Sequence, residues 1–108
     1  MKVTKKSIEI YHDNNGREPF TEWVKSISMS DRSRIFSRLD RVESGNLGDY
    51  KPVGDDVYEL RFHFGSGFRV YYGEVNNQII LLLCGGDKSS QKKDVKKAKV
   101  YWKDFINR

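Results

Sequence analysis

Residues 57–72 read VYELRFHFGSGFRVYY, two alternating apolar and polar segments joined by the linker GSG at residues 65–67. A glycine-rich linker between alternating segments predicts a β-hairpin, and a three-residue loop would place Phe64 opposite Phe68. Side chains alternate between the two faces of a strand, so one face of this hairpin is apolar. The other face collects polar side chains typical of a phosphate-binding site: Glu59, Arg61, His63, Arg69 and Tyr71.

The chain before the hairpin predicts one strand and two helices. Alternation indicates a short strand over residues 7–12. Apolar side chains at helical spacing then indicate a helix beginning at Pro19 and a second helix capped by Ser30 or Asp31. Gly45 is expected to end the second helix, because glycine readily adopts the left-handed conformation that follows a helix.

The chain around and after the hairpin completes the fold prediction. Residues 46–56, NLGDYKPVGDD, are expected to form a connecting loop. Residues 78–84 are apolar throughout, which indicates a strand covered on both faces, and residues 90–106 have the spacing of an amphipathic helix. We therefore predict a single α+β domain over residues 1–108. It has two layers, in which a mainly antiparallel sheet of about four strands packs against two N-terminal helices and one C-terminal helix.

Composition narrows the class of protein. The net charge of +5 favours a polyanionic partner, although a protein with many surface lysines has the same balance. Cys84 ends an apolar run and is expected to be a small buried side chain, and the two histidines lie too far from it in sequence for a zinc site. We expect no metal and no cofactor. No segment approaches the ~20 apolar residues of a membrane span, so a cytoplasmic protein is expected.

Three segments, taken in order, carry a resemblance to a known family. They are ELR at residues 59–61, GFRVYY at residues 67–72 and LLLCGGDKSSQKKD at residues 81–94. With the predicted order of elements, the chain resembles the RelE/ParE superfamily of bacterial toxins, and within it the HigB-like branch of addiction module killer proteins. The resemblance implies a RelE-like fold and a type II toxin that cleaves messenger RNA, often on the ribosome. It also implies a small helix-turn-helix antitoxin as partner, with operator DNA bound only through that antitoxin.

The resemblance transfers part of the family's site to this chain. Arg69 matches the arginine of the strand motif, and Lys88 matches the basic residue after the final strand. Arg61 keeps one of two alternating basic residues on the preceding strand, whereas Glu59 stands at the position of the other. Asp94 stands where some relatives have a tyrosine.

Metal-free cleavage of RNA uses the neighbouring 2′-hydroxyl as nucleophile. The protein must then position the backbone, stabilise charge on the phosphorane and transfer protons. Arg69, Arg61 and Lys88 are the candidates for charge stabilisation, because cations, and above all arginine forks, pair with phosphate oxygens. Three residues are candidates for proton transfer, with a rim histidine, an ion-paired carboxylate and a half-buried tyrosine as the structural alternatives: His63, Glu59 and Tyr71.

Basic side chains outside the hairpin are candidates for contacts with RNA: Lys51, Lys92, Lys93, Lys96 and Arg38. A solvated helix face explains the lysines equally well, and the arginines of the second helix also suit contact with an antitoxin. Two other functions remain open. One is inhibition of DNA gyrase without catalysis, as in the ParE branch. The other is an RNA-binding module that has lost cleavage, which Glu59 and Asp94 favour.

Overall fold

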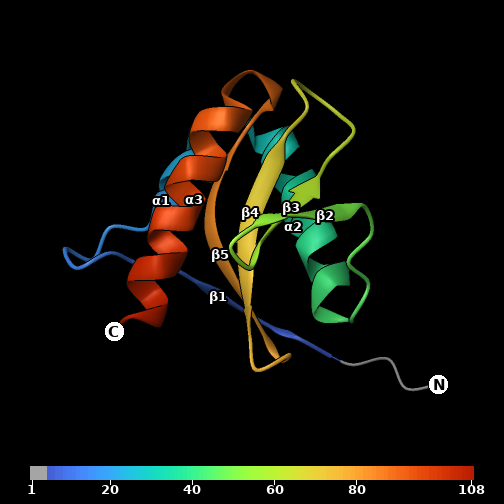
Figure 1. Cartoon of the computed structure of the whole chain (residues 1–108). Coiled ribbons are helices and arrows are strands. Elements are labelled where there is room, and N and C mark those ends of the chain that lie inside the picture. The colour runs from blue at the N-terminus through green and yellow to red at the C-terminus, as the bar shows by residue number, and fades with distance from the viewer. Residues whose placement is uncertain (1–4) are drawn as a thin grey trace.

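The computed structural model describes residues 5–108, which form one mixed sheet with helices on both sides (Figure 1). The sheet order is β1-β5-β4-β3-β2, with β1 parallel to β5 and every other pair antiparallel. The predicted α+β class, two N-terminal helices and C-terminal helix are confirmed. The elements in chain order are β1 (Ser7–Ile10), α1 (Pro19–Lys25), α2 (Met29–Glu43), β2 (Tyr50–Gly54), β3 (Val57–Arg61), β4 (Arg69–Val75), β5 (Ile79–Gly86), the 3₁₀ helix η1 (Lys88–Ser90) and α3 (Gln91–Ile106).

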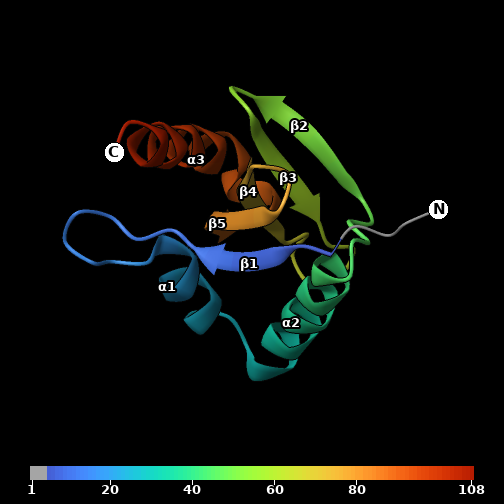
Figure 2. The same ribbon diagram turned by 90° about the horizontal axis from the view of Figure 1, so that it is seen from below.

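The two groups of helices lie on opposite faces of the sheet, as Figure 2 shows. One apolar cluster joins α1 and α2 to the face that carries Leu60 and Val70, and a second joins α3 to the face that carries Tyr71 and Leu83. The sheet is therefore a middle layer rather than one of two layers. This arrangement explains why β5 is apolar along most of its length, since both of its faces are covered.

Residues 46–56, which were expected to form a loop, contain the additional strand β2. β2 pairs with β3 through a tight turn at Asp55 and Asp56, which both adopt positive φ values of 56° and 64°. Pro52 and Gly54 interrupt the alternation that would have indicated a strand. A proline is tolerated here because β2 is the edge strand, where one side of the backbone has no ladder partner.

The hairpin register differs from the predicted register by two residues. Leu60 pairs with Val70, not with Tyr72, and β3 ends at Arg61 opposite Arg69. The backbone N–H of Phe62 still donates to the carbonyl of Phe68 at 3.0 Å, so the connecting loop is longer than the three residues expected. A shift of two residues preserves the face of every side chain, because the strand period is two.

Capping residues and glycine predicted the start of α1 and the end of α2 correctly, but not the start of α2. Pro19 is the first residue of α1, and Gly45 has a φ of 93° just after α2, as expected. The cap of α2 is Ser28, whose hydroxyl accepts from the backbone N–H of Asp31 at 3.1 Å, not Ser30 or Asp31. The helix therefore begins earlier than its first apolar residues suggest.

Cys84 is buried on β5 and is 5% exposed, as expected. Burial and the nearby charge of Asp94 raise the pKa of its thiol to about 12. Across residues 5–108 no three side chains of the His, Cys, Asp or Glu type are grouped to hold a metal ion. Over the same residues, no helix combines the length and apolar character needed to cross a membrane.

Candidate functional site

The loop that connects β3 to β4 meets the chain just after β5, although the two segments are far apart in sequence. The hydroxyl of Ser66 donates to Oδ2 of Asp87 at 3.1 Å, and the backbone N–H of Lys88 donates to the carbonyl of Ser66 at 3.4 Å. Gly67 has a φ of 76°, and a Cβ at this position would lie 3.3 Å from Cβ of Lys88. The linker at residues 65–67 and the segment GGDK at residues 85–88 therefore form one continuous surface.

A capping box fixes the chain where it leaves β5. The carboxylate of Asp87 accepts from the backbone N–H of Ser89 at 2.9 Å, and the hydroxyl of Ser90 accepts from the backbone N–H of Asp87 at 3.3 Å. Hydrogen bonds from Ser89, and then from Ser66, lower the pKa of Asp87. The turn holds Lys88 at the first position of η1, with its side chain exposed.

The polar face of the hairpin contains a buried carboxylate held by several partners. Glu59 is 0% exposed. Its Oε1 accepts from Nε of Arg61 at 2.9 Å, and its Oε2 accepts from Nε2 of Gln91 at 2.9 Å. Nε of Arg69 lies 3.9 Å from the same Oε2. The site therefore joins β3 and β4 to the first residue of α3.

These partners keep Glu59 charged. Burial by itself would raise its pKa, but the hydrogen bonds from Arg61 and Gln91 and the charge of Arg69 outweigh burial. The pKa of Glu59 is therefore lower than its ordinary value. The carboxylate is thus an ion-paired group inside the protein, which was the structural alternative for this residue.

Two buried polar atoms lie close to the carboxylate of Glu59 without a well-formed hydrogen bond. Across residues 5–108, Nε of Arg69 and Oη of Tyr71 are the buried side-chain nitrogen and oxygen atoms left unpaired. Burial, followed by the charge of Glu59, raises the pKa of Tyr71. An unpaired buried polar group costs about 1–3 kcal/mol, and such groups call for a functional explanation. The cluster of Glu59, Arg61, Arg69 and Tyr71 is therefore a candidate site and not only a stabilising ion pair.

His63 lies outside this cluster. It was expected to face Arg69, but the strand partner of Arg69 is Arg61, because β3 ends before His63. Nε2 of His63 lies 2.6 Å from Oδ2 of Asp49, and the side chain is 75% exposed. The histidine therefore stands at the rim of the site, in the loop that follows β3.

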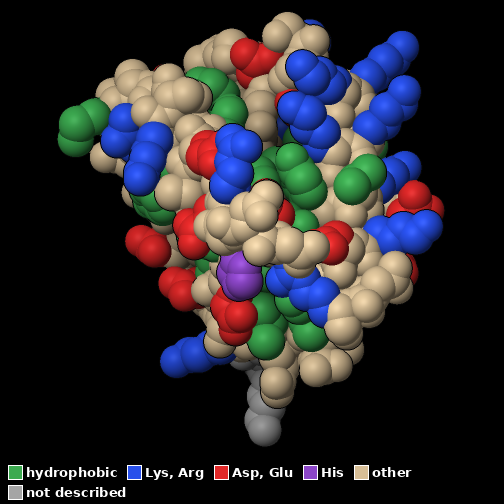
Figure 3. All heavy atoms as spheres, turned by 90° about the vertical axis from the view of Figure 1, so that its left-hand side faces the viewer, with side chains coloured by type: hydrophobic (Ala, Val, Ile, Leu, Met, Phe, Trp, Pro, Cys, Tyr) green, Lys and Arg blue, Asp and Glu red, His purple; other side chains and the backbone are tan. Residues whose placement is uncertain are grey.

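Four of the candidate lysines are exposed near the cluster. Lys51 is the strand partner of Glu59 on the edge strand β2, and three others occupy the first turns of α3 after Lys88: Lys92, Lys93 and Lys96. Figure 3 shows several Lys and Arg side chains grouped along one side of the molecule. Their exposure fits either a contact with RNA or a solvated helix face.

Arg38 does not belong with these outward basic side chains. Its guanidinium donates to the carbonyls of Arg61, Leu47 and Asp49, and it lies 4.8 Å from the centre of the Phe62 ring. Arg38 was expected on the outer face of the second helix. It is turned inward, where it donates to one backbone carbonyl at the end of β3 and to two in the connection that follows α2.

The structure adds three site residues that the sequence reasoning did not assign to the site. Gln91 reaches Glu59 from α3, and no pattern in the sequence marks it. The hydroxyl of Ser90 donates to the carboxylate of Asp94, and Asp94 is buried against Gly86. A Cβ on Gly86 would lie 1.8 Å from Oδ2 of Asp94, so only glycine fits there. The i, i+4 spacing of Ser90 and Asp94 was the one available signal.

Comparison with known proteins identifies the family. The family model "Phage derived protein Gp49-like (DUF891)" matches residues 22–103. The chain belongs to the Gp49-like family. An uncharacterized protein of Haemophilus influenzae is 43% identical to this Gp49-like protein over 82 residues, which cover 75% of this chain and 83% of the relative.

A solved structure confirms the fold. A double arginine mutant of the E. coli toxin RelE in the free state superposes with a TM-score of 0.64 over 90% of this chain and 96% of that chain. The two sequences are 15% identical, so this likeness concerns the fold. The Gp49-like protein therefore has a RelE-like fold, with two N-terminal helices, a mixed five-stranded sheet and a C-terminal helix.

Proposed function

We propose that this Gp49-like protein is the toxin of a type II toxin–antitoxin system, of the HigB-like branch, and that it is an endoribonuclease. Its substrate is messenger RNA in the cytoplasm, on the ribosome, and cleavage uses the 2′-hydroxyl without a metal. The observation that carries the proposal is the cluster of Arg61 and Arg69 around a buried carboxylate, together with Lys88 held against the hairpin loop at Ser66. The RelE-like fold supports the same class of protein.

Arg61, Arg69 and Lys88 bind the scissile phosphate and stabilise the phosphorane. Nε is the atom through which the Arg61 guanidinium bonds to Glu59, and its side chain is 31% exposed. The hydrogen bond to Glu59 raises the pKa of Arg61, so this arginine stays charged. A preorganised cation acts on the charge of the transition state without having to move during the reaction.

Glu59 and Tyr71 are positioning residues in this scheme. Both side chains are fully buried, so neither contacts a substrate bound at the surface. Glu59 orients Arg61 through a hydrogen bond and lies 3.9 Å from Nε of Arg69, and Tyr71 shares their strand face. Of the three candidates for proton transfer, His63 is the one whose ring is open to solvent, and we propose this role for it.

The double substitution Arg69→Ala with Lys88→Ala tests the proposal. Expression of the wild type is expected to arrest growth and to cut transcripts, and the double variant is expected to do neither while it stays folded. Lys103→Ala, an exposed change at the far end of α3, is the matched control and should arrest growth like the wild type. Cut transcripts in cells expressing the double variant would contradict the site. DNA damage in place of cut transcripts would favour inhibition of gyrase.

A second candidate is an RNA-binding module without cleavage. The observation that favours it is Glu59, whose charge partly neutralises both arginines of the cluster. In that case the purified protein would retard RNA on a gel and leave every transcript whole. Purified wild-type protein incubated with messenger RNA, free and bound to ribosomes, separates the two candidates.

The partner of this toxin would be a small helix-turn-helix antitoxin, with operator DNA bound only by the complex. Co-expression with the adjacent small reading frame tests the partner. The expected results are a stable complex on purification and relief of growth arrest. An adjacent reading frame that neither binds nor relieves the arrest would count against this pairing.

A further inference from the structure

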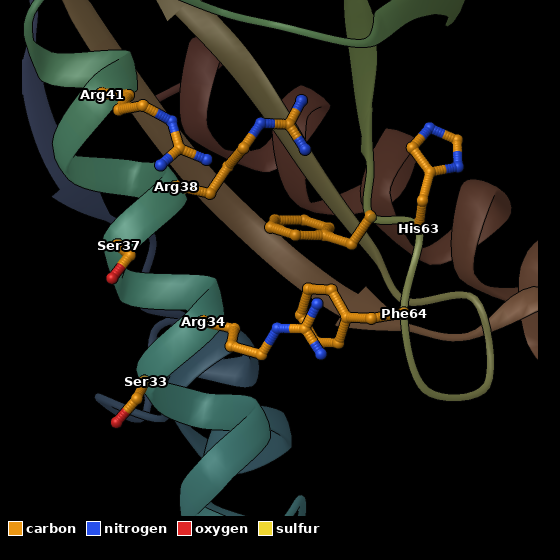
Figure 4. Close-up of a pocket in the computed structure, with 8 residues that line it drawn as sticks. Ser33, Arg34, Ser37, Arg38, Arg41, His63 and Phe64 are labelled. Atoms are coloured by element: carbon orange, nitrogen blue, oxygen red, sulfur yellow. The ribbon is translucent and has the colours of Figure 1, made fainter.

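A second cationic surface lies on the sheet face opposite Glu59. It is a groove of about 460 Å³ between α2 and the segment at residues 62–64, as Figure 4 shows. Arg34, Arg38 and Arg41 line it from α2, and Phe62 and Phe64 line it from the other side. No residue that lines the groove within the described chain is acidic. Of the residues that line it, the proposed catalytic site uses His63 alone, and Arg34 and Arg41 have no part in that site.

The arginines of the groove form one stripe and differ in their freedom. They are spaced i, i+4 and i+7, which places them on one face of α2. Arg38 is bound to three carbonyls and contributes charge only. The Arg34 guanidinium stacks 3.8 Å from the centre of the Phe64 ring, and stacking leaves its N–H edges available. Arg34 and Arg41 are both exposed, and neither forms an ion pair within residues 5–108.

We propose that this groove binds the phosphodiester backbone of RNA, as a second contact beyond the candidate site; this rests on the proposed function. Arginine forks match phosphate oxygens, and the hydroxyls of Ser33 and Ser37 supply further donors along the groove. Arg34 and Arg41 are separated by about 10.5 Å along the helix axis (7 residues at 1.5 Å). An open groove of this length suits a chain of phosphates better than a single anion.

The groove and the Glu59 cluster are adjacent along the chain, because residues 62–64 directly follow Arg61. Arg61 ends β3 on the face that carries Glu59, and Phe62 and Phe64 lie on the groove face, with exposed His63 between them. An RNA strand whose scissile phosphate lies at Arg61 and Arg69 therefore reaches the groove by crossing the rim at His63. The groove would hold the flank of the substrate or an adjoining segment of ribosomal RNA.

The test compares RNA binding by two charge-matched double variants. R34A/R41A removes both free arginines of the groove, and K25A/K103A removes two exposed lysines elsewhere. The probes are a fluorescent 2′-O-methyl trinucleotide and a longer 2′-O-methyl single strand, neither of which can be cleaved. Binding is measured by fluorescence anisotropy over a salt series, and thermal unfolding checks that each variant is folded.

For R34A/R41A we expect the affinity advantage of the long strand over the trinucleotide to shrink. The slope of log K against log salt for the long strand should fall by about 1.4, which is 0.7 for each of two lost phosphate contacts. K25A/K103A should keep the slope of the wild type. The charge-reversal variant R34E/R41E should reduce the affinity for the long strand further than R34A/R41A does. A loss seen only in co-sedimentation with ribosomes would assign the groove to ribosomal RNA and still support the proposal.

An unchanged slope in R34A/R41A on both the long strand and ribosomes would overturn the proposal. So would an equal loss in K25A/K103A, which would show a general effect of charge. Normal RNA binding with loss of antitoxin binding would assign the groove to a protein and also overturn it. Cleavage of unmodified messenger RNA by the wild type, free and on ribosomes, is measured in parallel. Binding without cleavage would refute the ribonuclease while the anisotropy data still decide the groove.

Discussion

At the scale of single residues, Glu59 decides how the site is built. A carboxylate with 0% exposure would be costly by itself, and it is stable here because Arg61, Gln91 and Arg69 surround it. Removing one member of a buried ion pair leaves the others uncompensated, which costs about 3–5 kcal/mol. Glu59, which stands where the resemblance to RelE-like toxins implies a basic residue, therefore holds Arg61 by a hydrogen bond and lies close to Arg69.

Glu59→Gln is expected to lower the free energy of unfolding at neutral pH by about 3 kcal/mol, because it leaves two arginines without their counter-charge. The folded state lowers the pKa of Glu59, so its stabilisation is complete above the ordinary carboxyl pKa of about 4.3 and disappears as the pH falls through the folded value. The stability difference between wild type and variant should therefore shrink in acid. Urea unfolding at several pH values measures it, and a difference that stays constant down to the acid limit would contradict the assignment.

Gly86→Ala is expected to destabilise the protein by about 1–3 kcal/mol, since the new Cβ would overlap Oδ2 of Asp94. Thermal unfolding measures the loss. The double variant Gly86→Ala with Asp94→Ala removes the carboxylate that is in the way and should be less destabilised than the sum of the two single changes. Simple additivity of the two would show that Gly86 and Asp94 do not oppose each other.

At the scale of elements, α2 is fastened to the sheet by Arg38 as well as by apolar packing. The side chain of Arg38 joins the carbonyl of Arg61, at the end of β3, to carbonyls of Leu47 and Asp49 in the connection that follows α2. A planar fork with several donors can serve three acceptors at once, and an ammonium group on a flexible stem does so poorly.

Arg38→Lys is accordingly expected to lower the free energy of unfolding by about 1 kcal/mol although the charge is kept, because three backbone carbonyls, two of them in partly buried hydrogen bonds, lose the guanidinium donor. Arg41→Lys, on an exposed position of the same helix, is the matched control and should change stability little. Chemical unfolding of both variants gives the comparison. Equal stability of the two would mean that the carbonyls near Arg38 find other partners.

At the scale of the whole molecule, the site exists because the hairpin loop and the end of β5 meet. Ser66 and Asp87 are 21 residues apart and joined by one hydrogen bond, and Asp87 also caps η1. Lys88 is placed by these contacts and not by any local preference. The site is therefore as rigid as the contact between the two segments.

Asp87→Ala is expected to reduce RNA cleavage although it removes no phosphate-binding side chain, because it frees the turn that holds Lys88. Ser66→Ala removes only the contact across the loops and keeps the cap, so its effect should be smaller. Initial rates of cleavage are compared with thermal unfolding of the same variants. A cleavage rate for Asp87→Ala equal to that of the wild type would show that Lys88 needs no such support.

The amino-acid sequence alone determined the order of every helix and strand except β2, and the composition of each face of the β3–β4 hairpin. The predicted and the observed hairpin registers differ by two residues, and the strand period is also two. Both registers therefore place the same four side chains on one face: Glu59, Arg61, Arg69 and Tyr71. Three facts came only from the tertiary structure: the burial of Glu59 under Gln91, the inward turn of Arg38, and the place of Lys88 beside Ser66. Each depends on contacts between segments distant in sequence. Local periodicity reports which face a side chain takes, and it carries no information about what covers that face.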